Sequence, residues 1–232
     1  MFSSMTQASR KMSSIVLYHF PPSAPCRFAL MTARTLGLDV EIKKVNLLQK
    51  EQFKEEFLKI NPQHSVPTIQ DGDFTIWDSH AISTYLVGKY GEGSSLYPHD
   101  LRERALVDQK LYFDATVVFT RIRAVCVPFI YGSATSVPDD LKKSVVDALE
   151  LLDTFLKGKT WLVGEKLTLA DIANAASVSN AEVVGYDLSQ HPNVNSWYER
   201  CKSSIKGFDE NLKGAADFAA LIKVNHPGPL FP

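Results

Sequence analysis

The sequence predicts a protein of two parts, an α/β domain followed by an all-α domain. Two observations carry this prediction. Short apolar runs alternate with helical patterns over residues 15–91, whereas helical spacing of apolar residues accounts for almost all of 98–224. Between the two, the stretch 91–95 is rich in glycine and serine and is followed by a proline at 98, which is typical of a linker.

Each element of the first part is indicated by its own pattern. The apolar run 15–19 predicts a strand, and 25–37 predicts a helix that a glycine ends. Residues 40–45 alternate apolar and polar side chains, as a strand with one buried face does. The spacing of apolar residues over 51–60 predicts a short helix, which Asn61-Pro62 ends.

Two further strands and a helix complete this part. Residues 66–70 and 74–77 flank Asp71-Gly72-Asp73, a strong signal for a hairpin, and 78–90 has a helical pattern. The resulting order β-α-β-α-β-β-α is that of the thioredoxin-like fold. This fold combines a parallel pair of strands with an antiparallel hairpin and has helices on both faces.

The second part is predicted to be helical throughout. Helical spacing extends over about 101–131, 139–156, 169–184 and 193–204. Just before the third of these segments, Thr-Leu-Ala-Asp at 168–171 predicts a capping box that starts a central helix.

The two ends of the chain differ in composition from the rest. Residues 1–14 are rich in serine and contain basic but no acidic residues, which predicts a disordered extension. Mitochondrial presequences share this composition, so targeting stays open as an alternative. The tail 225–232 is too rich in proline for a helix, and we expect it to lie over the surface.

Overall composition excludes several classes of partner. The 25 Lys and Arg residues balance 26 Asp and Glu, without the basic surplus that nucleic acid or an acidic membrane surface requires. No apolar run approaches the roughly 20 residues that span a bilayer. Cys26, Cys126 and Cys201 are too few and too far apart for a disulfide framework, which favours a reducing compartment. We therefore expect a cytoplasmic protein without nucleic-acid or membrane partners.

The junction of the first strand and helix carries the most informative motif, Ser23-Ala24-Pro25-Cys26-Arg27. A helix N-terminus directs free N–H groups and the positive end of its dipole at whatever lies there. Thioredoxin-like redox proteins place Cys-x-x-Cys at such a junction, but here Ser23 occupies the first position. A hydroxyl cannot exchange disulfides, yet it can donate a hydrogen bond to the thiolate of a bound molecule. The motif predicts a thiol-binding site, with a simple helix cap as the alternative.

A second motif, Val66-Pro67, places a proline where a strand is about to begin. Proline removes a hydrogen-bond donor from the ladder, and in the cis form it would turn the backbone of Val66 outward. The N–H and C=O of Val66 would then hold an extended peptide by a short β-like pairing. An ordinary turn proline is the alternative interpretation.

A third motif, Asp78-Ser79-His80, begins the helix 78–90. Ser79 and the following N–H groups form an anion site suited to a carboxylate, and Asp78 could bind an ammonium group. Simple capping is again the alternative. A ligand end that needs both charges is an amino-acid head such as a γ-glutamyl group. Together, the thiol site, the peptide clamp and the amino-acid site predict glutathione as the ligand.

The chain resembles the cytosolic glutathione transferases of the insect delta/epsilon type, over residues 14 to 215. The resemblance rests on motifs in a fixed order and spacing: Ser23-Ala24-Pro25-Cys26-Arg27, Asn61-Pro62-Gln63-His64-Ser65-Val66-Pro67, Asp78-Ser79-His80-Ala81-Ile82, Ser95-Leu96-Tyr97-Pro98 and Leu167-Thr168-Leu169-Ala170-Asp171. Asp78-Ser79-His80 and Arg121-x-Arg123 favour the epsilon class. The resemblance implies that the protein conjugates the thiolate of glutathione to apolar electrophiles for detoxification, with glutathione as co-substrate and no metal. It also implies a related peroxidase reaction with organic hydroperoxides.

The resemblance further assigns roles to individual residues. Ser23 matches the catalytic serine of the family. The residues matched to glutathione contacts are Gln52, His64, Val66, Pro67, Asp78, Ser79 and His80. Gln52 is a departure, because many relatives have a histidine there. Glutamine can donate a hydrogen bond but supplies no positive charge, so we expect somewhat weaker glutathione binding.

The electrophile site is expected on the long helix after the linker. Phe119, Arg123, Val127 and Tyr131 recur every four residues and share one helix face. Such a stripe is typical of a core, but the resemblance assigns it to the acceptor pocket. Pro128 is expected to kink this helix and shape the pocket.

Two other functions remain as alternatives. A non-catalytic carrier of this fold would bind apolar ligands without turnover, but the motifs that such carriers often lose are present here. Thiol transfer through Cys26 is disfavoured, because the second cysteine position of the motif is usually buried.

A homodimer is also predicted, partly from the resemblance. In addition, the helix 78–90 has apolar residues on more than one face: Ala81, Ile82, Tyr85, Leu86 and Val87. A second apolar face needs a second partner, and a symmetry mate is the simplest one.

Overall fold

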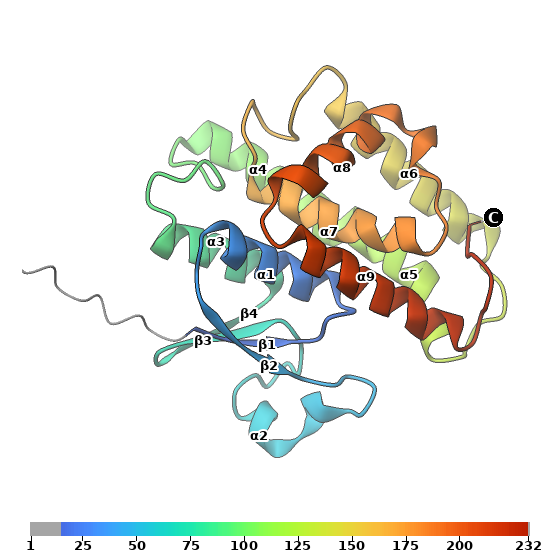
Figure 1. Ribbon diagram of the computed structural model, residues 1–232, viewed down its shortest axis with the longest axis horizontal. Coiled ribbons are helices and arrows are strands. Elements are labelled where there is room, and N and C mark those ends of the chain that lie inside the picture. The colour runs from blue at the N-terminus through green and yellow to red at the C-terminus, as the bar shows by residue number, and fades with distance from the viewer. Residues whose placement is uncertain (1–14, 232) are drawn as a thin grey trace, which may run out of the picture.

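The computed structural model describes residues 15–231, in which a small sheet with its helices joins a helical bundle (Figure 1). The predicted extension, 1–14, lies outside these residues. The elements of the first part, in chain order, are β1 (Ile15–His19), α1 (Ala24–Thr35), β2 (Val40–Lys44), a 3₁₀ turn η1 (Glu51–Phe53), α2 (Glu55–Leu58), β3 (Thr68–Asp71), β4 (Phe74–Trp77) and α3 (Ser79–Tyr90). The predicted order β-α-β-α-β-β-α is confirmed.

The sheet has the strand order β2-β1-β3-β4, with β1 parallel to β2 and antiparallel to β3. Asp71 pairs with Phe74 across the predicted hairpin, where Gly72 adopts a φ of +66°. Helices α1 and α3 cover one face of the sheet, and α2 lies on the other (Figure 1). On the α2 side, the ring of Phe57 contacts the ring of Tyr18 edge to face, at 5.5 Å. This is the predicted thioredoxin-like arrangement.

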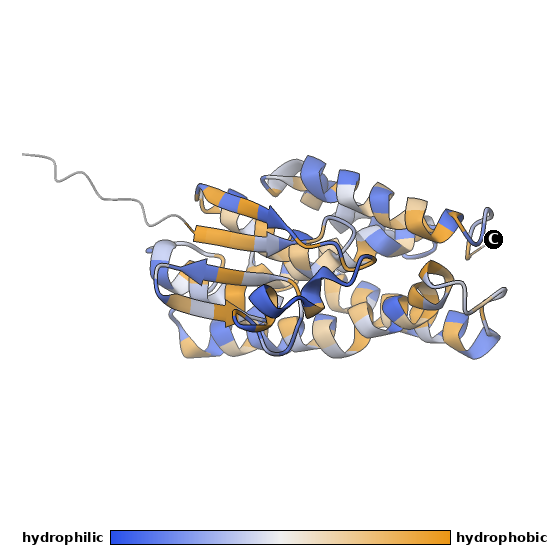
Figure 2. Ribbon diagram, turned by 90° about the horizontal axis from the view of Figure 1, so that it is seen from below, coloured by the Kyte–Doolittle hydropathy of each residue, from blue (hydrophilic) through white to orange (hydrophobic). Residues whose placement is uncertain are grey.

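The second part consists of helices that surround α7, whose residues 169–181 are all buried. Its elements, in chain order, are α4 (Leu101–Phe113), a π-helical segment η2 (Asp114–Val118), α5 (Phe119–Ile130), α6 (Asp139–Leu156), α7 (Leu169–Val183), a 3₁₀ turn η3 (Leu188–Gln190), α8 (Pro192–Ser204) and α9 (Phe208–Lys223). The outer helices carry both hydrophobic and hydrophilic residues, as amphipathic helices around a core do (Figure 2). None of the helices in 15–231 is long and apolar enough to cross a membrane.

Three details differ from the sequence predictions. The expected helix 101–131 is interrupted by the π-helical turn η2, and α5 passes through Pro128 to end at Ile130. The expected helix 51–60 is shorter and divided between η1 and α2. Helix α9 was not predicted, although its apolar residues have helical spacing. A Cβ at Gly214 of α9 would collide with the carbonyl of Pro21, so this helix lies directly against the loop before α1.

The two domains share one hydrophobic core. Phe28 and Met31 of α1 and Val87 of α3 pack with the apolar side chains of the helical bundle. Ile82 and Leu86 of α3 instead face the sheet. Two apolar faces of α3 are therefore covered within one chain, whereas Ala81 and Tyr85, the other apolar residues of the predicted dimer face, are only partly buried.

Polar contacts fix the helical bundle at two further places. Asp171 is fully buried and forms the predicted capping box with Thr168 at the start of α7. The tail after α9 is non-helical, as predicted, and packs against the bundle. Its Leu230 is buried and donates its N–H to the carbonyl of Val184, and the Asn225 amide donates to the carbonyl of Phe129 at the end of α5.

Candidate active site

Ser23 is the N-cap of α1, and the sequence accounts for this local structure. Its hydroxyl oxygen accepts from the N–H of Cys26 at 3.4 Å, and Pro25 occupies the first turn, where no N–H is needed. The capping bond uses a lone pair of the oxygen and leaves the hydroxyl hydrogen available to a ligand. Helix capping and donation to a thiolate are therefore compatible roles for this one side chain.

Cys26, three residues later, is completely buried, as the sequence predicts. Its sulfur accepts from the N–H of Phe20 at 3.5 Å, and burial raises the pKa of its thiol to about 11. Because the thiolate is the reactive form of cysteine, Cys26 is poorly suited to nucleophilic attack. Burial likewise raises the pKa of Cys126 to about 12.

A cleft between the two domains, here called the polar cleft, brings together every residue matched to a glutathione contact. It is lined by Ser23, Gln52, His64, Val66, Pro67, Asp78, Ser79 and His80. The helical domain contributes the opposite wall, including Asp114, Phe119 and Arg123. Residues from three loops of the first domain thus surround one space, as the sequence predicts.

The backbone of Val66 is free to pair with a ligand. The Val66–Pro67 bond is cis, and β3 begins its pairing only at Thr68, so Val66 stays outside the ladder. Asn61 holds the preceding loop from beneath. It is fully buried, and its amide donates to the carbonyl of Ser65 at 3.0 Å and to the hydroxyl of Thr68 at 2.9 Å.

The start of α3 differs in part from its predicted role. Asp78, with a φ of +73°, accepts from the N–H groups of His80 and Ala81, at 2.9 and 3.1 Å. These two donors are therefore not available to a ligand anion. The N–H and the hydroxyl of Ser79 remain near the cleft, and the Asp78 side chain is largely exposed.

His80 reaches across the cleft to the helical domain. Its Nε2 lies 3.1 Å from Oδ2 of Asp114, the first residue of the π-helical segment. Burial disfavours the charge on His80, but the hydrogen bond and the negative charge of Asp114 outweigh it and raise the pKa of His80 above 6.5. The second carboxylate oxygen of Asp114 is buried without a hydrogen-bond partner within residues 15–231.

Asp114 was not predicted as a site residue. Its sequence signal is a single acidic residue among mostly apolar neighbours at 111–118. That pattern alone does not indicate whether the side chain faces the cleft, the core or solvent. Gln52 also has an unpartnered, buried side-chain oxygen beside the cleft. Among the described residues, no group of histidine, cysteine and acidic side chains could hold a metal ion.

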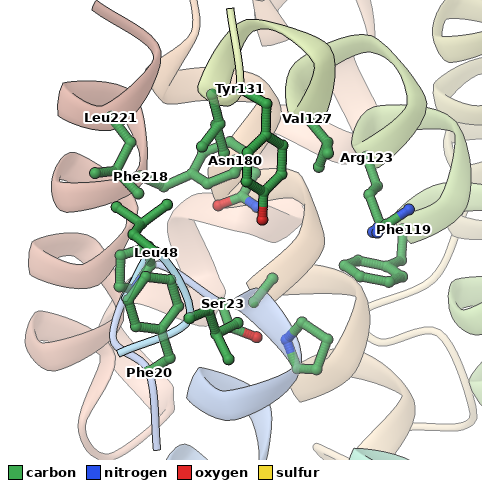
Figure 3. Close-up of a pocket in the computed structure, with 15 residues that line it drawn as sticks. Phe20, Ser23, Leu48, Phe119, Arg123, Val127, Tyr131, Asn180, Phe218 and Leu221 are labelled. Carbon is green, nitrogen blue, oxygen red and sulfur yellow. The ribbon is translucent and has the colours of Figure 1, made fainter. Parts of the chain in front are cut away.

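A second cavity, here called the apolar pocket, adjoins the polar cleft (Figure 3). The predicted residues Phe119, Arg123, Val127 and Tyr131 all line it from α5 and its end. The sequence reasoning missed other wall residues, which come from distant segments: Phe20, Leu48, Asn180, Phe218 and Leu221.

Ser23 and Arg123 border both cavities. Arg123 is exposed and forms no salt bridge with any residue that the structure describes. A sulfur atom bound beside Ser23 would therefore lie where a polar ligand and an apolar ligand meet, next to an unpaired cation.

Comparisons with known proteins agree with this geometry. Residues 13–88 match the family model for the glutathione S-transferase N-terminal domain, and residues 114–204 match that for the C-terminal domain. A delta-class glutathione transferase from Nilaparvata lugens is 42% identical, with a TM-score of 0.87, over 91% of this chain and 99% of that one.

Two further solved structures are similar. An epsilon-class glutathione S-transferase from the housefly, Musca domestica, is 40% identical, with a TM-score of 0.86, over 91% of this chain and 98% of that one. A glutathione transferase homologue from Drosophila mojavensis, with bound glutathione, is 39% identical, with a TM-score of 0.87, over 92% and 98%. These values do not separate the delta from the epsilon class, so the epsilon assignment stays a prediction.

Proposed function

The chain belongs to the glutathione transferase family, of the insect delta/epsilon type, and on this premise we propose that it conjugates glutathione to apolar electrophiles at Ser23. The observation that carries the proposal is the meeting of the polar cleft and the apolar pocket at this serine. One cavity suits a charged peptide and the other an apolar acceptor, so their junction is where a bond between the two would form.

Ser23 is proposed to donate its hydroxyl hydrogen to the sulfur of glutathione. This hydrogen bond, together with the N-terminal field of α1, favours the thiolate over the thiol. The thiolate then attacks the electrophile, and the contacts at both ends of the peptide hold the sulfur in position. Cys26 takes no part, because its own thiol is buried and un-ionised at neutral pH.

The two ends of the peptide are proposed to bind on opposite sides of the sulfur. The N–H and hydroxyl of Ser79 suit the γ-glutamyl carboxylate, and the exposed carboxylate of Asp78 suits its ammonium group. His80, which also lines the cleft, is held in place by its contact with Asp114. Val66 pairs with the cysteinyl backbone, and Gln52 and His64 receive the glycyl end.

The acceptor is proposed to occupy the apolar pocket. Phe119, Val127 and Tyr131 supply apolar and aromatic surface, and Arg123 places a positive charge beside the reacting atoms. A cation there stabilises negative charge that leaves with, or develops on, the electrophile.

We propose that the protein is a cytoplasmic homodimer, as the family resemblance implies. The clearest support for a second chain comes from α4. Leu101 and Tyr112 are 77% and 70% exposed and lie three turns apart on one face of α4. Exposed apolar side chains aligned in this way suit burial against a second copy.

Steady-state kinetics with an aromatic halide test the proposal. We expect saturation with both glutathione and the halide, and a thioether product in amounts equal to the halide released. The dipeptide cysteinylglycine, which lacks the γ-glutamyl group, should be a poor substrate because it cannot reach Ser79 and Asp78. A protein that binds the halide but yields no thioether would be a carrier instead.

A further inference from the structure

The apolar pocket contains an amide whose orientation the protein determines. Asn180, from α7, lines the pocket and is only 5% exposed (Figure 3). Its Oδ1 accepts a hydrogen bond of 2.6 Å from Nη2 of Arg27. Because a guanidinium group can only donate, the oxygen of the amide must face Arg27, and the nitrogen must face elsewhere.

Arg27 is an unusual partner, because it is a buried cation bound only by neutral groups. It is 2% exposed and donates to the side chains of Asn180 and Asn211 and to the carbonyls of Pro21, Pro22 and Ala176. Burial lowers its pKa to about 10, so the group remains charged at neutral pH. No carboxylate among the described residues forms a salt bridge with it.

The amide nitrogen of Asn180 has no acceptor of its own. Within residues 15–231, no side chain or carbonyl accepts a hydrogen bond from Nδ2. This nitrogen is also not fully buried, unlike the unpartnered polar atoms of the interior. It therefore reaches the pocket. Figure 3 shows the Asn180 side chain among the residues that line the pocket, apart from Ser23.

A cation that donates a hydrogen bond to the oxygen of an amide draws electron density away from the amide nitrogen. Hydrogen bonds in such a chain strengthen one another, so the N–H groups of Asn180 donate more strongly than those of an ordinary amide. The remaining walls near Asn180 are mostly apolar, which increases the strength of any hydrogen bond formed there.

We propose that Asn180 is a specificity-determining residue that selects electrophiles with an acceptor oxygen a few bonds from the reacting carbon, namely α,β-unsaturated carbonyl compounds. This inference rests on the proposed function. The sulfur beside Ser23 attacks the β-carbon while Asn180 holds the carbonyl oxygen across the pocket. An alkyl halide offers no such oxygen, and the reacting oxygens of a hydroperoxide lie at the sulfur itself.

Addition of the glutathione thiolate to such a compound needs no further reactant except one proton. The thiolate lone pair forms the new C–S bond, the C=C π electrons move to the α-carbon, and negative charge develops on the carbonyl oxygen as an enolate. Asn180 stabilises this charge as an oxyanion donor does. A proton from water then adds to the α-carbon, and nothing is oxidised, reduced or released.

Two substrates with the same six-carbon chain, 2-hexenal and 1-iodohexane, test the inference. In Asn180→Asp, Arg27 keeps a hydrogen-bonded oxygen, but the donor facing the pocket is lost. We expect the ratio of kcat/KM for hexenal to that for iodohexane to fall about tenfold or more relative to the wild type.

Asn211→Asp is the matched control, because Asn211 also accepts from Arg27, at 2.9 Å, but lines neither cavity. This variant places the same negative charge beside Arg27. It should leave the hexenal-to-iodohexane ratio of kcat/KM within about twofold of the wild type, since no pocket donor is removed. Equal changes in the ratio in both variants, or no change in either, would overturn the inference.

Two further measurements keep the test decisive. If Asn180→Asp fails to fold, as judged by its circular dichroism melt, Asn180→Leu removes the donor at similar volume and should lower the same ratio. If the wild type forms a thioether with neither the aromatic halide nor the two six-carbon substrates, the proposed function fails. If it converts the halides but not hexenal, the proposed function stands and the role of Asn180 is overturned.

Discussion

Ser23 shows how one side chain can serve both structure and chemistry. Its oxygen accepts from the N–H of Cys26 and so caps α1, while its hydrogen is free to point at a ligand. Capping and thiolate stabilisation look like competing explanations in the sequence. In the structure one orientation of the Ser23 side chain serves both roles, because the free N–H groups of α1 that need a cap also attract an anion.

Gln52 is the residue at which a single change should improve binding. Its side-chain oxygen is buried beside the polar cleft without a partner. We predict that Gln52→His, assayed at about pH 6 where histidine is mostly protonated, adds positive charge near the glycyl carboxylate and lowers the KM for glutathione about two- to fivefold, as an ion pair worth up to about 1 kcal/mol would. The kcat should stay unchanged. Gln49→His, on the exposed neighbouring turn, is the control, and an equal effect there would contradict the prediction.

His80 should make stability depend on pH. Asp114 raises the pKa of His80 in the folded protein above 6.5, so the charged pair stabilises the fold fully below about pH 6.5 and is lost as the pH rises through the raised pKa. In His80→Gln, the loss in free energy of unfolding should be larger at about pH 6 than at about pH 9.

Urea denaturation of both proteins at the two pH values measures this difference. Burial lowers the pKa of His19 to about 4, which destabilises the fold in acid, but this effect is common to both proteins and cancels. The same loss at both pH values would show that His80 is not charged in its contact with Asp114.

At the scale of elements, α7 depends on one buried carboxylate. Asp171 accepts from the N–H groups of Thr168 and Leu162 and from the indole of Trp197, each at 2.9 Å. We predict that Asp171→Ala lowers the free energy of unfolding by about 3 kcal/mol or more, because several buried donors lose their acceptor. Asp187→Ala removes an exposed cap and should cost only about 1 kcal/mol. Equal losses in chemical denaturation would contradict this account of α7.

The elements were predictable where their signals are local. Alternating and helical spacing located the strands and most helices, and Thr168 with Asp171 located the start of α7. The π-helical turn at Asp114 was not predicted, because the shift of one residue that it causes in the apolar spacing is too small to recognise in a single sequence. The carboxylate that His80 contacts therefore stayed hidden, since it depends on that turn and on a contact between domains.

At the scale of the molecule, the site exists only because the two domains pack together. Sequence motifs identified the loops that line the polar cleft, since each motif is contiguous. For the apolar pocket, only the lining residues on α5 and at its end were predictable. Phe218 of α9 and Asn180 of α7 line the same pocket, but their place follows from packing between distant segments around Arg27.

The predicted homodimer belongs to the same scale. Light scattering at micromolar concentration should give about twice the 25.8 kDa mass of one chain. Replacing Leu101 and Tyr112 together by glutamate should yield monomers, because both exposed side chains lie on one face of α4. Leu151→Glu, on α6, is the control and should stay dimeric. A wild-type mass of a single chain would contradict the prediction.

The central claim is that Ser23 stabilises the thiolate of bound glutathione, and the pKa of that thiol tests it most directly. The ultraviolet absorbance of the thiolate, recorded against pH, should give a pKa below that of free glutathione in the wild type. In Ser23→Ala it should rise by about one to two units, because a hydrogen bond to a charged group contributes about 1.5–3 kcal/mol. Cys26→Ala should leave it unchanged. Equal pKa values in the wild type and in a folded Ser23→Ala would show that Ser23 is only a helix cap.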